Sequence, residues 1–157
     1  MKNYQSNVAV IIPCFNESQT IEEVIKEYKL YLPKATIYVI DNNCTDNTSE
    51  IASKSGAIVL SEKKQGKGNA IKHAFKNIDS NCYVLVDGDG TYPADKVNEM
   101  CNIVLNDQAD MVIGDRLSSS YFSQSKKILN GLGNRFIRSY INRKFKVNLC
   151  DILSGSR

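Results

Sequence analysis

The sequence predicts an α/β fold, a mainly parallel twisted sheet flanked by helices, in a single domain covering residues 1–157. Short apolar runs rich in β-branched residues alternate with stretches whose apolar residues recur at helical spacing. Alternation of this kind is typical of parallel sheets with helices on both faces. A chain of 157 residues can form one domain with a substantial core but leaves little room for a second.

Five apolar runs, each followed by a polar turn, are predicted as strands: residues 8–12, 36–40, 57–60, 82–86 and 110–114. Helical periodicity predicts helices between and after them. The first begins near Thr20, which with Glu23 resembles a capping box, and Pro93 suits the first position of the fourth. The predicted helices cover residues 20–32, 46–56, 66–78, 93–105 and 126–145.

The composition argues against several classes of protein. The longest apolar runs hold about five residues, whereas a membrane span needs about 20. The N-terminal residues 1–7 lack the apolar core of a signal peptide, so we expect a cytoplasmic protein. Five cysteines without a CxxC pair argue against a zinc site, and a single histidine argues against a His-rich metal site or a Ser–His–Asp triad.

The basic residues are concentrated in the predicted last helix. Residues 126–146 contain lysines and arginines but no acid. Such a helix fits peripheral contact with the inner, anionic face of a membrane, although a core-facing helix with a solvated basic back explains the same pattern. The net charge is only +3 and the stretch lacks interleaved exposed aromatic residues, so no nucleic-acid partner is expected.

Polar residues follow four of the predicted strands. Because ligands of open α/β sheets bind at the carboxyl ends of strands, these residues are expected to converge on one site. They are Pro13, Asn16 and Glu17; Asp41 and Asn42; Asp87 and Asp89; and Asp115 and Arg116.

Asp87-Gly88-Asp89 directly follows an apolar strand. Two carboxylates on a glycine-containing turn offer the hard oxygen ligands that Mg²⁺ and Mn²⁺ share with phosphates. The alternative is an ordinary Asp-Gly turn. Arg116 is a candidate phosphate ligand because its guanidinium can bind two oxygens, while Lys67 either meets an anion at a helix start or is only a solvated charge.

Four motifs in this order resemble inverting family 2 glycosyltransferases with the GT-A fold. They are the segments VIIPCFNE (10–17), VIDNNCTDNT (39–48), GKGNA (66–70) and VDGDG (86–90). Gly-Asp-Arg at 114–116 and the segment 151–157 place the resemblance nearest to the dolichyl- or polyprenyl-phosphate mannosyltransferase branch. Relatives usually continue beyond position 157, so the resemblance implies a nucleotide-sugar-binding part without its C-terminal part.

The resemblance also implies roles for individual residues. Pro13, Phe15, Glu17 and Asp41 would hold the base and ribose of a nucleotide sugar, with Lys67 beside them. Asp89 would ligate Mg²⁺ or Mn²⁺, and Asp87 would touch the ribose or the metal. The residues that would meet phosphates are Arg116 and Arg135, and the catalytic set would be Asp89, Arg116 and Asp151. The chain departs from the family at Asn42, where many members carry a second aspartate.

The expected reaction moves a sugar from GDP or UDP to polyprenyl or dolichyl phosphate with inversion. A lipid phosphate is already anionic and needs no strong base, whereas a sugar hydroxyl would require one, for which Asp151 is the late candidate. A saccharide acceptor and a catalytically inactive nucleotide-binding fragment remain open as alternatives. A nucleotidyltransferase is disfavoured, because a glycine-rich basic loop would be expected where residues 13–17 stand.

Overall fold

The computed structural model describes residues 8–114, 139, 143 and 144. The sheet and its helices lie in one compact unit, to which residues up to Val112 belong. In chain order the elements are β1 (Val8–Cys14), α1 (Ile21–Tyr31), β2 (Thr36–Asp41), α2 (Thr48–Lys54), β3 (Ile58–Ser61), α3 (Lys67–Asn77), β4 (Cys82–Leu85) and α4 (Val97–Leu105).

The four strands form one parallel sheet in the order β3-β2-β1-β4. In the register, Val10 of β1 pairs with Ile37 of β2 and with Val84 of β4. The predicted parallel α/β architecture is therefore confirmed. Because β1 is central, the loop that follows it leaves the middle of the sheet's carboxyl edge, where a ligand can be reached from both sides.

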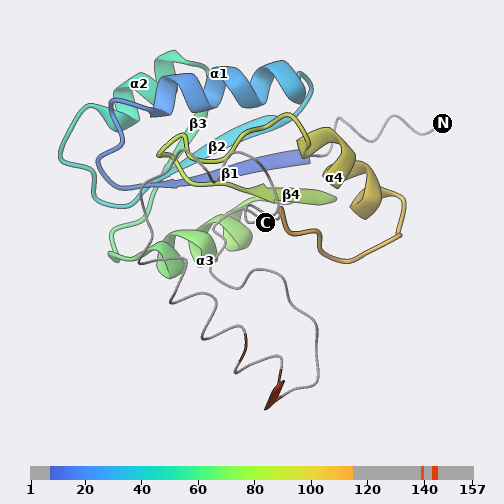
Figure 1. Cartoon of the computed structure of the whole chain (residues 1–157). Helices are drawn as coiled ribbons and strands as arrows, with labels where there is room; N and C mark the ends of the chain where they lie inside the picture. The colour runs from blue at the N-terminus through green and yellow to red at the C-terminus, as the bar shows by residue number, and fades with distance from the viewer. Residues whose placement is uncertain (1–7, 115–138, 140–142, 145–157) are drawn as a thin grey trace. The chain divides into compact units, whose positions relative to one another are not determined.

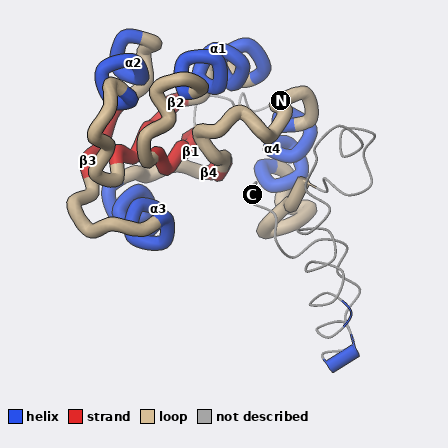
Figure 2. The backbone as a smooth tube through the Cα atoms, turned by 60° about the vertical axis from the view of Figure 1, so that its left-hand side comes forward, coloured by secondary structure: helices blue, strands red, loops and turns tan. Residues whose placement is uncertain are grey.

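Side chains of β1 alternate between two apolar clusters, as the two-residue period of a strand requires. Val8, Val10 and Ile12 join the larger cluster with apolar residues of α1, α2 and α4. Ala9 and Ile11 join a smaller cluster with α3. Figures 1 and 2 show α1 and α2 over one face of the sheet and α3 over the other. Both faces are thus covered, which explains the uninterrupted apolar sequence of β1.

Two sequence-based predictions about the fold were wrong. The run at 110–114 forms no strand, and Met111 is 63% exposed. A strand requires a partner ladder, and within the described residues the sheet ends at β4 without pairing to this run. The fourth helix begins at Val97 instead of Pro93, because Ala94–Val97 first closes a turn in which the Val97 N–H donates to the Ala94 carbonyl over 3.0 Å.

The predicted capping box at the start of α1 is also absent. Thr20 occupies the N-cap position but makes no side-chain capping bond. Its hydroxyl instead donates to the carbonyl of Gly88, 68 residues away, over 2.6 Å. Among the described residues, no helix combines the length and apolar character needed to cross a bilayer.

Candidate functional site

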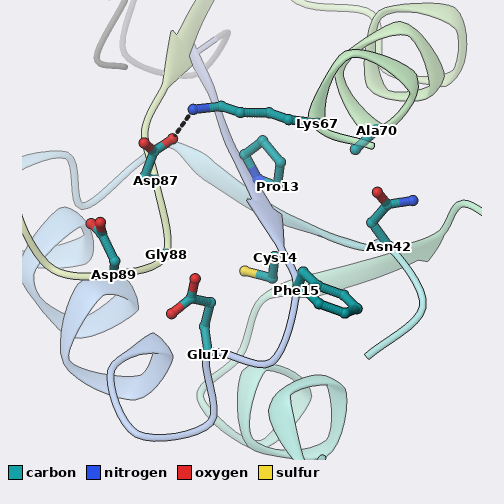
Figure 3. A pocket seen from close by; sticks show the side chains of 10 residues that line it. All are labelled: Pro13, Cys14, Phe15, Glu17, Asn42, Lys67, Ala70, Asp87, Gly88 and Asp89. Carbon is teal, nitrogen blue, oxygen red and sulfur yellow. Dashed lines mark hydrogen bonds and ion pairs between the residues drawn. The ribbon is translucent and has the colours of Figure 1, made fainter. Parts of the chain in front are cut away.

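A pocket of about 220 Å³ opens at the carboxyl ends of β1, β2 and β4 beside the start of α3. Figure 3 shows the side chains that line it. They are Pro13, Cys14, Phe15, Glu17, Asn42, Lys67, Ala70, Asp87, Gly88 and Asp89. Three of the four predicted strand ends therefore meet at one place, and the fourth, Asp115 with Arg116, lies outside the described residues.

One wall of the pocket is neutral. Phe15, at the tip of β1, is 50% exposed, whereas Asn42, directly after β2, is only 4% exposed. Pro13 lies between Lys67 and Phe15 in Figure 3. A half-exposed aromatic ring beside a buried amide offers a surface on which a planar base can stack.

The loop that carries Phe15 is bound to the loop after β2 by an interloop clamp. The Glu17 N–H donates to the Thr48 hydroxyl over 2.9 Å, and the Ser18 N–H donates to Asp46 over 3.1 Å. The Asn16 side-chain oxygen accepts the Thr45 N–H over 2.7 Å. The hydrogen bond from Thr48, with a second from Ser18, lowers the pKa of Asp46 to about 2. Asp46 therefore has the structural role that its place in a turn predicts.

The opposite wall is acidic. Glu17 from the β1–α1 loop and Asp87 and Asp89 from the acidic loop (residues 87–90) line the same pocket. Burial, and then the charges of Asp89 and Asp87, raise the pKa of Glu17. Glu17, Asp87 and Asp89 therefore place negative charge on one wall of the pocket, which is the electrostatic condition that favours a cation.

Gly88 allows the acidic loop to approach β1 closely. A Cβ at this position would lie 2.9 Å from Cys14 Sγ and 3.3 Å from Glu17 Cγ. The Cys14 thiol is buried, and burial raises its pKa, so it acts as neutral packing. The hydroxyl of Thr20 holds the other side of the loop through the Gly88 carbonyl. Side chains at 87 and 89 are thereby brought to the pocket from either side of one glycine.

Asp87 and Asp89 have different partners. The Lys67 ammonium, from the first residue of α3, pairs with Asp87 (Figure 3). Asp89 accepts hydrogen bonds from Thr91, at 3.0 Å from its N–H and 2.7 Å from its hydroxyl. Lys67 therefore lies at the pocket, in a half-exposed ion pair with Asp87.

Asp41 does not line the pocket. Its carboxylate accepts the Cys44 N–H over 2.8 Å and the Ser49 hydroxyl over 2.6 Å. Partial burial by itself would raise the pKa of Asp41, but the hydrogen bonds from Ser49 and Cys44 outweigh it and lower the pKa. In the described structure the residue after β2 that reaches the pocket is Asn42.

Several predicted residues lie outside the described part of the chain, namely Arg116, Arg135, Asp151 and most of the predicted helix at 126–145. Conversely, the sequence did not single out Cys14 or Thr20 for the site. In the sequence, Thr20 indicated only the start of a helix. Its hydrogen bond to Gly88 joins residues 68 positions apart, which no local pattern reports.

The donor set suits a hard divalent cation, although no group of three or more His, Cys, Asp or Glu residues within the described residues is arranged as a complete metal site. Carboxylate oxygens are the ligands that Mg²⁺ and Mn²⁺ prefer, and both ions commonly take their remaining ligands from phosphates and water. Such a cation would offset the charges of Asp89 and Asp87, which after burial are the next causes of the raised pKa of Glu17.

Comparison with known proteins gives consistent matches. A family model described as "Glycosyl transferase family 2" matches residues 9–156. The chain is 47% identical over 110 residues to Protein RfbJ of Shigella flexneri, covering 70% of this chain and 85% of RfbJ. It is 38% identical over 155 residues to Glycosyltransferase AglJ of Haloferax volcanii, covering 96% of this chain and 49% of AglJ. A dolichyl-phosphate hexose transferase of the same organism is 32% identical over 129 residues, which cover 82% of this chain and 55% of that protein.

Solved structures match as well. Glucosyl-3-phosphoglycerate synthase from Mycobacterium tuberculosis, in complex with Mn²⁺ and UDP-glucose, aligns with a TM-score of 0.55 and 27% identity over 63% of this chain and 39% of that chain. Its complex with Mn²⁺, UDP and phosphoglyceric acid aligns with a TM-score of 0.69 over 96% of this chain and 54% of that chain, at 20% identity. The second match shows a shared fold. The chain thus spans about half the length of most of these relatives.

Proposed function

The chain belongs to glycosyl transferase family 2, and from that premise we propose that its pocket binds a nucleoside-diphosphate sugar with a divalent cation and transfers the sugar, with inversion, to a polyprenyl- or dolichyl-type phosphate. The observation that carries the proposal is the division of the pocket into a neutral wall and an acidic wall with Lys67 between them. We further infer that residues 1–157 act as one GT-A domain.

The neutral wall fits the nucleoside. Phe15 would stack on the base, and Pro13 would limit its position. Glu17, which lines the acidic wall of the same pocket, can accept hydrogen bonds from ribose hydroxyls. The described structure does not bring Asp41 to this wall, so a role for Asp41 would be to hold the β2–α2 loop through Cys44 and Ser49.

The acidic wall and Lys67 fit the diphosphate. Asp89, with Asp87, would hold Mg²⁺ or Mn²⁺, which when bound neutralises negative charge on the departing nucleoside diphosphate. Lys67 can leave Asp87 and place its ammonium on a phosphate oxygen, because the ion pair is half-exposed and such pairs are weak. Arg116 and Arg135 are proposed as further phosphate ligands and belong to the same scheme.

The acceptor is proposed from similarity and chemistry together. The dolichyl-phosphate hexose transferase among the relatives supports a lipid phosphate. A phosphate acceptor already carries the charge needed for attack, so this pocket would need no general base. If a saccharide hydroxyl is the acceptor instead, Asp151 is the proposed base.

The donor site is tested by calorimetry with UDP-glucose and GDP-mannose, each with and without Mn²⁺. We expect one donor to bind in a metal-dependent manner, and Asp89→Ala to lower the affinity by roughly tenfold or more, the size expected when a charged interaction is lost. Asp79→Ala is the matched control, because Asp79 is exposed and precedes β4 at the opposite edge of the sheet.

Donor binding that is the same with and without metal, and the same in Asp89→Ala, would refute the scheme. Transfer assays with polyprenyl phosphate against oligosaccharides then separate the two acceptor classes. Tight donor binding with no transfer to either acceptor would favour a binding module.

A further inference from the structure

We propose that Asn42 is a positioning residue whose side-chain amide locks the β3–α3 loop (residues 62–66) and so sets Lys67 at the diphosphate end of the pocket, an inference that rests on the proposed function. The amide links the end of β2 to the loop that leads into α3. No other residue described in this loop region is both buried and bound to three separate backbone groups of the same segment.

All hydrogen-bonding positions of the Asn42 amide nitrogen are used. The nitrogen donates to the Glu62 carbonyl over 2.8 Å and to the Lys64 carbonyl over 2.9 Å. The amide oxygen accepts the Gly66 N–H over 2.6 Å. The loop thus has one buried side chain at its centre, and Asn43 adds a bond from its own amide to the Lys63 carbonyl over 2.6 Å.

Only an amide satisfies this arrangement. Two backbone carbonyls require two N–H donors, and the Gly66 N–H requires an acceptor, which also fixes the orientation of the amide. An aspartate of the same size would keep the bond from Gly66 but would direct a carboxylate oxygen at two carbonyl oxygens. Removal of both donors from a site that is 4% exposed leaves the loop carbonyls without these partners.

The lock reaches Lys67 through Gly66. Gly66 has φ +121°, a conformation that favours glycine, and its carbonyl accepts the first helical bonds of α3 from Asn69 at 2.9 Å and Ala70 at 3.1 Å. Lys67 is the first residue of α3, so the position of Gly66 determines where the lysine side chain starts. From there the ammonium crosses over β1 to Asp87 at the end of β4 (Figure 3).

The test is a double-mutant cycle in the full 157-residue chain with Asn42→Asp and Lys67→Met. The probes are UDP and GDP, each with Mn²⁺, and the readout is affinity by calorimetry. Each single substitution should weaken binding of the preferred nucleotide about tenfold, the size of one lost charge-assisted bond, and the double variant should weaken it no further. Losses that multiply would overturn the lock, because a merely structural Asn42 would act independently of Lys67.

A pH profile adds a readout specific to the amide. As the pH falls, the introduced carboxyl gains a proton and can donate one hydrogen bond to a loop carbonyl. Affinity of Asn42→Asp should therefore recover relative to the unmodified chain at low pH, and an unchanged ratio would count against the inference. Asn77→Asp is the matched control, since its exposed amide donates to the His73 carbonyl over 2.7 Å within α3.

Hydrogen exchange at the Gly66 amide decides the lock without any ligand. We expect faster exchange in Asn42→Ala, which removes the acceptor of the Gly66 N–H, and, to a smaller degree, in the milder variant Asn43→Ala. If neither nucleotide binds the unmodified chain, the proposed function fails but the lock is still judged by this exchange. Equal exchange at Gly66 in all folded variants would overturn it.

Discussion

The two walls of the pocket are held in different ways. The neutral wall is held by the interloop clamp, in which hydrogen bonds join the β1–α1 loop to the segment after β2. Thr48, which accepts one of these bonds, is fully buried. The acidic wall is held by the Thr20–Gly88 bond, the exposed Lys67–Asp87 pair and a local turn at Asp89. Under the proposed function, the nucleoside would therefore meet a preformed surface, whereas the diphosphate and cation would complete the acidic wall.

The largest effect is expected for Gly88→Ala, which forces the acidic loop away from β1. The new Cβ would lie 2.9 Å from Cys14 Sγ, and overpacking of this kind costs about 1–3 kcal/mol. Thermal unfolding should show the loss of stability, and calorimetry with UDP and Mn²⁺ should show weaker binding. Gly68→Ala is the control, because a Cβ there meets no atom within 4 Å.

Gly88→Ala combined with Cys14→Ala should recover part of the stability, since the closest contact is then removed. No recovery would mean that the glycine is required for another reason than the close approach to Cys14.

Thr48→Val breaks the interloop clamp. It removes a fully buried hydroxyl and leaves the Glu17 N–H without that acceptor, which we expect to cost about 2 kcal/mol of unfolding free energy. Chemical denaturation measures this value. The loss of nucleotide-binding free energy should be no larger than the loss of unfolding free energy. A Thr48→Val variant as stable as the original chain would show that the clamp does not hold the neutral wall.

Thr20→Val is the same chemical change on the acidic side. Loss of the 2.6 Å bond to the Gly88 carbonyl should cost about 1 kcal/mol, because Thr20 is only partly buried. Here metal-dependent nucleotide affinity should fall more than stability, since the loop that carries Asp87 and Asp89 is released. The comparison between the two walls is wrong if both threonine variants lose stability and affinity in the same ratio.

Glu17→Gln should have the smallest effect and the opposite sign. A carboxyl with a raised pKa favours the folded state only while it is protonated, and this contribution is lost as the pH rises through the raised pKa. At pH 7 the glutamine variant should therefore unfold at a slightly higher temperature than the original chain.

The advantage of the glutamine variant should disappear as the pH is lowered through the raised pKa of Glu17 toward its ordinary value of 4.5. Glu23→Gln, at an exposed position of α1, is the control. A stabilisation that persists unchanged in acid would rule out the ionised Glu17 carboxylate as its cause.

Much of the fold could be predicted because residue type and spacing within each segment indicate whether it forms a strand or a helix. The apolar runs that became β1, β2, β3 and β4 are short and β-branched, and the structure places each within two residues of its predicted ends. The run at 110–114 looks similar in sequence but forms no strand, because strand formation depends on a neighbouring ladder that periodicity does not report.

The candidate site could be predicted as a region and less well as a set of side chains. Glu17, Lys67, Asp87 and Asp89 follow strand ends or open a helix, and the structure gathers them. Asp41 and Asn42 both follow the same strand, and only their environment distinguishes them. Asp41 bonds Ser49 of α2, while Asn42 bonds the loop before α3.

By itself, the sequence determined the order of strands and helices, the apolar faces and the concentration of carboxylates after two strands, because these depend on residue type and spacing along the chain. Only the tertiary structure decided that Thr20 holds Gly88, that Lys67 meets Asp87 and that Asn42 enters the pocket. The first two contacts join residues at least 20 positions apart, and the third distinguishes Asn42 from its neighbour Asp41. All three depend on the order of the strands in the sheet.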